Sequence, residues 1–131
     1  MEILGTSIIG FSSALQSDTS IKAVDPSTGL EIEPPFYNAE SETVEQAATL
    51  ASQAFLIYSK KSSHERASFL NEIATQIESI GAALVTRAMQ ETGLPEGRIK
   101  GETGRTTGQL RLFASLIEDG SWTQARIETA L

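Results

Sequence analysis

Cysteine is absent from the 131-residue chain, and histidine and tryptophan each occur once. Without cysteine, the chain has no disulfide, no thiolate metal site and no thiol nucleophile. The lone histidine, His64, leaves no second histidine for a zinc-binding pair. Basic residues are also few: ten lysines and arginines against seventeen acids give a net charge of −7. Because this charge repels polyanions on average, nucleic-acid binding is not expected.

Long apolar runs are missing as well. No run approaches the roughly 18 apolar residues that a membrane-spanning helix needs. The first residues, MEILGTSIIGF, lack the basic region and long apolar core of a secretory signal. We therefore expect no membrane association and take the cytoplasm as the compartment. The composition, 40% hydrophobic and 21% charged, is that of one ordinary soluble domain.

Residues 1–40 are predicted to form a β-arm of two or three short antiparallel strands. TSIIGF and SIKAV are short and rich in β-branched residues. DPSTG (25–29) has the proline and glycine that are typical of a turn. LEIE is the next strand candidate, and Pro34-Pro35 is expected to end it, since proline has no N–H to donate to a sheet.

Residues 41–120 are predicted to hold three helices, of which the first covers 41–60. Ser41 or Thr43 is a candidate N-cap, and Thr43 with Gln46 is a candidate capping box. Apolar residues recur at spacings of three and four, which indicates one buried face. That face comprises Val44, Ala47, Ala48, Ala51, Phe55 and Tyr58.

The second helix is expected to run unbroken over 63–92. Ser62 and Glu65 have the S-x-x-E spacing of a capping box, and Gly93 is typical of a helix end. Gly81 is a mild weakness inside this helix. The predicted buried stripe comprises Phe69, Leu70, Ile73, Ile77, Ile80, Leu84 and Ala88.

The stretch ETGLPEGRIKGETGRTTGQLR (91–111) combines glycines with basic residues. A phosphate-binding loop is one interpretation, but neither G-x-x-x-x-G-K-[ST] nor G-x-G-x-x-G occurs here. A helix face is indicated instead by the four, three and four residue spacing of Gly97, Gly101, Gly104 and Gly108. We therefore favour a third helix, 96–119, ended by Gly120. Each helical glycine costs about 1 kcal/mol, so a closely packed neighbour, inside or outside these residues, must offset that cost.

The remaining candidates for chemistry are isolated. His64 is interpreted as a solvated residue without a visible partner, with a general base as the alternative. Trp122 is interpreted as a core residue, with ligand stacking as the alternative. Glu102 and Arg105 have the spacing of a helical ion pair. Since no nucleophile, base and orienting group occur together, we assign no catalytic, cofactor-binding or metal-binding residue. SWTQARIETAL (121–131) is expected to begin an extended segment.

Four segments in order resemble the N-terminal part of aldehyde dehydrogenases. VDPSTGLEI (24–32) resembles their N-P-x-T-G-E segment, and ESETVEQAATLASQAFLIY (40–58) their first helix. SHERASFLNEIATQIES (63–79) resembles the E-R-A-x-x-L-x-x-I-A-x-x-I-E helix, and QETGLP (90–95) the following E-T-G-K-P. Asp25 and Leu94 depart from the Asn and Lys of these motifs. GRTTGQLRLFASLIEDGSW resembles the branch that oxidises α-ketoglutaric semialdehyde.

The resemblance implies an N-terminal fragment, α+β and mostly helical, of the Rossmann-like cofactor domain of an NAD- or NADP-dependent enzyme. The parent would oxidise a small aldehyde through a thiohemiacetal and a thioester on a cysteine, and would form dimers or tetramers. The family's cysteine, general-base Glu, oxyanion Asn, ribose-contacting Lys and glycine-rich coenzyme turn have no counterpart among these 131 residues. The fragment's partner would be the rest of the fold, and alone it is expected to be inactive and prone to associate. The alternative is an independent interaction module that binds through the glycine face.

Overall fold

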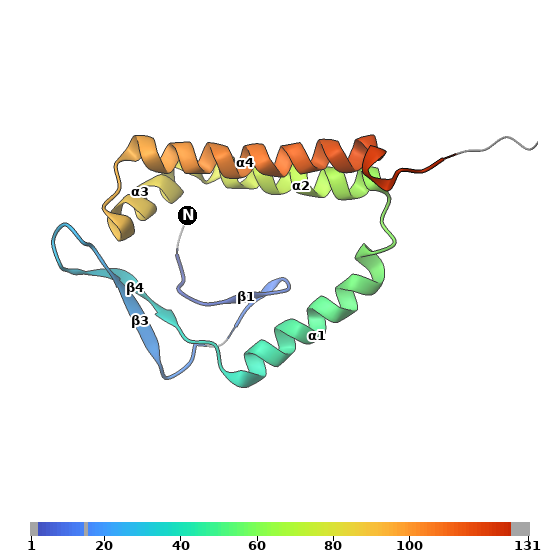
Figure 1. Ribbon diagram of the computed structural model, residues 1–131. Coiled ribbons are helices and arrows are strands. Elements are labelled where there is room, and N and C mark those ends of the chain that lie inside the picture. The colour runs from blue at the N-terminus through green and yellow to red at the C-terminus, as the bar shows by residue number, and fades with distance from the viewer. Residues whose placement is uncertain (1–2, 15, 127–131) are drawn as a thin grey trace, which may run out of the picture. The chain divides into compact units, whose positions relative to one another are not determined.

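The computed structural model describes residues 3–14 and 16–126, in which short strands precede helices (Figure 1). The strands are β1 (Ile8–Ile9), β2 (Ser12–Ser13), β3 (Ser20–Val24) and β4 (Glu31–Tyr37). The helices are α1 (Ser41–Tyr58), α2 (Ser63–Ser79), α3 (Gly81–Thr92) and α4 (Glu96–Asp119), followed by the 3₁₀ turn η1 (Ser121–Thr123). The described part is therefore α+β and mostly helical, as expected, but with four α-helices instead of three.

The chain divides into two compact units. The first comprises residues 1–60 and 82–99, which carry the strands, α1, nearly all of α3 and the first turn of α4. The second comprises residues 61–81 and 100–131, which carry α2 and most of α4. Each unit combines segments that are distant in the sequence.

The strands of the first unit form two antiparallel pairs, and the residues between β3 and β4 form a tight turn. β1 pairs with β2, and β3 pairs with β4. In the DPSTG turn, the carboxylate of Asp25 accepts hydrogen bonds from the amide and hydroxyl of Ser27, and the carbonyl of Asp25 accepts from the amide of Gly29. Gly29 has a φ of +71°, which glycine adopts without strain. The predicted turn is confirmed.

Strand β4 continues through its two prolines, so the prediction that Pro34-Pro35 ends the strand was wrong. The register between β3 and β4 shifts next to them: Ile21 pairs with Phe36, but Ala23 pairs with Ile32. This irregularity leaves the prolines outside the regular ladder, where their missing N–H groups cost no hydrogen bond. Gly5 lies against this stretch, and its carbonyl accepts from the amide of Tyr37 at 2.9 Å.

Arg87 joins α3 to β4 within the first unit. Its guanidinium donates to the carbonyl of Glu33 and the carboxylate of Glu91, and lies 5.4 Å from the centre of the Phe36 ring. An arginine over an aromatic face gains a cation–π attraction in addition to its hydrogen bonds. One side chain thus holds a helix and a strand together across a long sequence separation.

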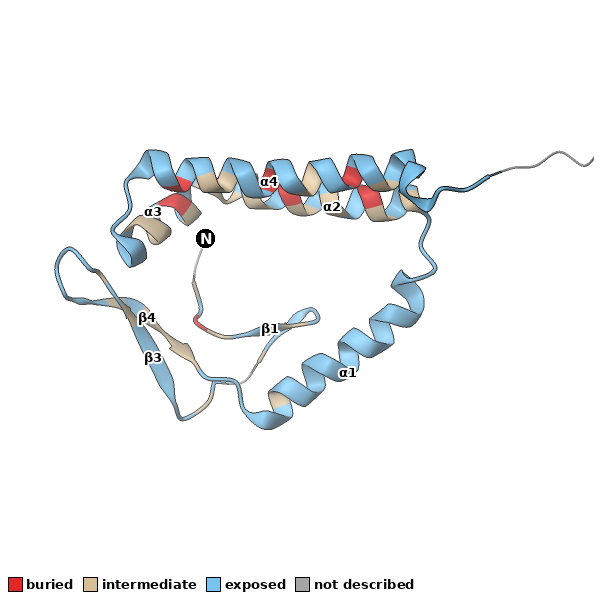
Figure 2. Ribbon diagram, in the orientation of Figure 1, coloured by how far each residue is buried: buried red, intermediate tan, exposed pale blue. Residues whose placement is uncertain are grey.

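Helix α1 matches its predicted range closely, but its predicted burial is wrong for this chain. None of its described residues is buried, and Figure 2 shows it exposed along nearly its whole length. Val44 is 58% exposed and Phe55 is 66% exposed. The apolar face exists and lies open in the described structure. The capping prediction also fails, because Glu40 occupies the N-cap position and makes no side-chain capping bond.

The helix predicted over 63–92 is broken into α2 and α3. Ile80 has φ −94° and ψ 5°, outside the helical region, and α3 begins at Gly81. The hydroxyl of Ser79 donates to the carbonyl of Gln76, so this carbonyl has a partner at the helix end. The break coincides with the border between the two units.

The predicted stripe across this break is covered only in part. Phe69 is 53% exposed, contrary to the prediction that it is buried. The remaining members of the stripe have intermediate exposure: Leu70, Ile73, Ile77, Ile80, Leu84 and Ala88. The predicted helix end is confirmed, since Gly93 has a φ of +69° and its amide donates to the carbonyl of Met89.

Candidate functional site

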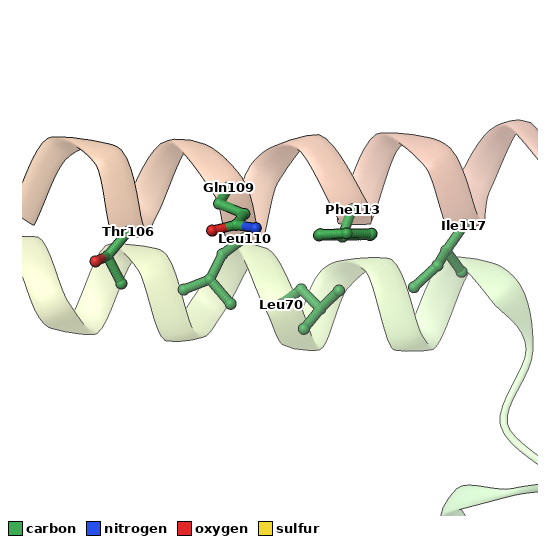
Figure 3. Close-up of a pocket in the computed structure, with 6 residues that line it drawn as sticks. All are labelled: Leu70, Thr106, Gln109, Leu110, Phe113 and Ile117. Atoms are coloured by element: carbon green, nitrogen blue, oxygen red, sulfur yellow. The ribbon is translucent and has the colours of Figure 1, made fainter.

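In the second unit, helices α2 and α4 lie side by side and antiparallel (Figure 3). Their contact is made by small side chains, which let two helix backbones approach closely. Figure 2 shows the buried positions of this unit gathered where the two helices face each other. They are Ala67, Ala74, Thr107 and Ala114, each at most 3% exposed.

The start of α2 is fixed by the capping box that its sequence predicts. The hydroxyl of Ser62 accepts from the amide of Glu65, and the carboxylate of Glu65 accepts from the amide of Ser62. Lys61 donates to the same carboxylate at 2.6 Å. The ammonium of Lys61, followed by the Ser62 donors, lowers the pKa of Glu65 to about 2.

Two polar pairs link α2 to α4. The guanidinium of Arg111 donates to both carboxylate oxygens of Glu78, at 2.7 and 2.9 Å. This two-pronged geometry lowers the pKa of Glu78 and raises the pKa of Arg111. Nearer the start of α2, Nδ1 of His64 lies 2.9 Å from a carboxylate oxygen of Glu118. Both pairs match the same antiparallel register of the two helices.

An open apolar groove of about 440 Å³ runs along this helix pair. Figure 3 shows its lining, which comes from both α2 and α4. The lining residues are Leu70, Thr106, Gln109, Leu110, Phe113 and Ile117. No charged side chain is among them, although the chain carries a net charge of −7. We refer to this surface as the α2–α4 groove.

The glycine-spaced stretch is helical, as predicted. α4 spans Glu96–Asp119 and ends at Gly120, which has a φ of +71°. A Cβ atom built on any of the four helical glycines would meet nothing within 4 Å, so the described residues supply no close neighbour for this face. The predicted helix is confirmed. The predicted close neighbour of its glycines is not among the described residues. We call this surface the glycine face: Gly97, Gly101, Gly104 and Gly108.

The helical conformation also removes the physical basis of a phosphate loop. A phosphate cradle needs backbone N–H groups that point at the ligand. In a helix, only the first-turn amides are left over, and the amides further along bond to carbonyls four residues earlier. Gly101, Gly104 and Gly108 all lie beyond the first turn of α4. Within the described structure, they do not form a coenzyme-binding turn.

The isolated candidates remain separate from one another. His64 has a partner, Glu118, contrary to expectation, but the bond joins it to a carboxylate and not to a hydroxyl that it could activate. Trp122 is 54% exposed in η1, so it does not fill a core here. Arg105 and Glu102 approach to 3.7 Å, as their spacing predicts. Ser121–Thr123 is a 3₁₀ turn instead of an extended segment, and residues 127–131 lie outside the described range.

Two further kinds of site are missing from the described ranges. Within residues 3–14 and 16–126, no group of three or more acidic or histidine side chains could hold a metal ion. None of the helices in this part of the chain is both long and apolar enough to cross a membrane. The α2–α4 groove and the glycine face are therefore the two candidate binding surfaces in the described part of the chain. Sequence periodicity indicated Leu70 of the groove and the four glycines, but the Glu78–Arg111 pair had no sequence signal.

Comparison with known proteins gives a family match over nearly the whole chain. The model of the aldehyde dehydrogenase family matches residues 13–130. An α-ketoglutaric semialdehyde dehydrogenase of Acinetobacter baylyi is 55% identical over 96 residues, which are 73% of this chain and 18% of that protein. An α-ketoglutaric semialdehyde dehydrogenase 2 of Azospirillum brasilense is 42% identical over 131 residues, 99% of this chain and 25% of that protein. The chain thus spans a quarter or less of the length of these curated relatives.

Proposed function

The chain belongs to the aldehyde dehydrogenase family, and on this premise we propose that it is the N-terminal part of an NAD- or NADP-dependent aldehyde dehydrogenase. The observation that carries the proposal is the 42% identity to the Azospirillum brasilense relative along 99% of the chain. We name α-ketoglutaric semialdehyde as the substrate and α-ketoglutarate as the product, because both relatives are named for that semialdehyde. The parent enzyme is proposed to be a cytoplasmic homo-oligomer.

Within that enzyme, the 131 residues would have a structural role. Gly101, Gly104 and Gly108 lie inside a helix and not in a strand-to-helix turn. This supports a dinucleotide site outside these residues. The chain also contains no cysteine to attack an aldehyde carbonyl. We therefore assign coenzyme binding and catalysis to the remainder of the parent, and assign this chain to the flank of its Rossmann-like domain.

The test compares the chain alone with a complete protein. The complete protein is the Azospirillum brasilense relative with its matched quarter replaced by residues 1–131. Each is incubated with α-ketoglutaric semialdehyde and NAD or NADP, and the absorbance of the reduced coenzyme is followed. We expect turnover from the complete protein and none above the buffer blank from the chain alone. Turnover by the chain, from material free of host enzymes, would contradict the assignment of chemistry, and a folded but inert complete protein would contradict the function.

A second candidate function rests on the open glycine face. A helix face made of glycines has no side chains in the way, so another helix or strand can pack close to its backbone. An independent interaction module would therefore bind a separate partner protein through this face. A monomeric chain with a sharp cooperative melt would favour this candidate, because the fragment of a larger fold should expose apolar surface and associate.

A further inference from the structure

We draw no further inference here: the strongest candidate, the open apolar α2–α4 groove, carries none, because nothing in the structure shows what covers it and its burial within a complete enzyme would restate an established property of the family's fold.

Discussion

Replacing Gly104 by alanine should stabilise the 131-residue chain. Gly104 lies in the interior of α4, and a Cβ atom there would meet nothing within 4 Å. The substitution therefore adds no clash and removes the conformational cost that glycine carries in a helix. We expect a gain of about 1 kcal/mol in the free energy of unfolding. The triple substitution that adds Gly101→Ala and Gly108→Ala should gain up to about 3 kcal/mol, because both positions are equally open.

The assay is the far-ultraviolet circular dichroism of dilute chain during thermal and urea unfolding. A gain of 1 kcal/mol corresponds to a midpoint shift of roughly 2–8 °C for a domain near this size. Gly120→Ala is the matched control. A Cβ atom at Gly120 also meets nothing within 4 Å, but the residue has a φ of +71°. Alanine there is strained by about 1 kcal/mol or more, so the control should shift the midpoint downward.

A lower midpoint for Gly104→Ala in the dilute chain would refute the conclusion that the glycine face is open. The effect should change sign in the complete enzyme if another element packs closely on this face. There, Gly101→Leu or Gly104→Leu should cost about 1–3 kcal/mol through overpacking. A replacement that leaves the melt of the complete enzyme unchanged but abolishes coenzyme binding would revive the phosphate-loop interpretation.

Three further predictions concern the α2–α4 pair. Ser62→Ala removes the hydroxyl that caps α2 and should cost about 1 kcal/mol, measured by urea unfolding, whereas Ser68→Ala at an exposed position should change little. The pKa of Glu65 is lowered from 4.5 to about 2, so the stability that its ionised carboxylate contributes is complete above pH 4.5 and is lost as the pH falls towards 2. In an acid titration of helix content, Glu65→Gln should therefore lack the loss of helix that accompanies protonation of Glu65. Ala114→Leu should cost about 1–3 kcal/mol in the same unfolding assay, because Ala114 is 1% exposed between the helices, whereas Ser115→Leu on the exposed side should cost much less.

Features with local causes were predictable from the sequence. The capping box needs only Ser62 and Glu65 at a spacing of three, and both of its hydrogen bonds are present. The range of α4 was predicted because a repeat of four, three and four matches the helical period even when glycine is the repeated residue. Gly93 and Gly120 ended helices as expected, since a positive φ is a local requirement.

Features that depend on competition between local and distant contacts were not predictable. The stripe from Phe69 to Ala88 keeps the helical period across Ile80, so periodicity gave no sign of a break there. Gly81 indicated a weakness, but a glycine inside a helix is often tolerated. Strand β4 continued through Pro34 because the register shift beside it accommodates the missing N–H, and pairing register is not visible in one strand alone.

Burial was the least predictable property, and the reason bears on function. An apolar period identifies the face of a helix that belongs against something, but it does not identify which polypeptide supplies the cover. Phe55 on α1 and Phe113 on α4 both lie on apolar faces, and both remain about half exposed or more in the described structure. For the glycine face, too, the spacing of the glycines predicts a closely packed neighbour, but the described residues supply none. The chain spans a quarter of the Azospirillum brasilense relative. On our proposal, the three surfaces would be covered by the further polypeptide of such an aldehyde dehydrogenase.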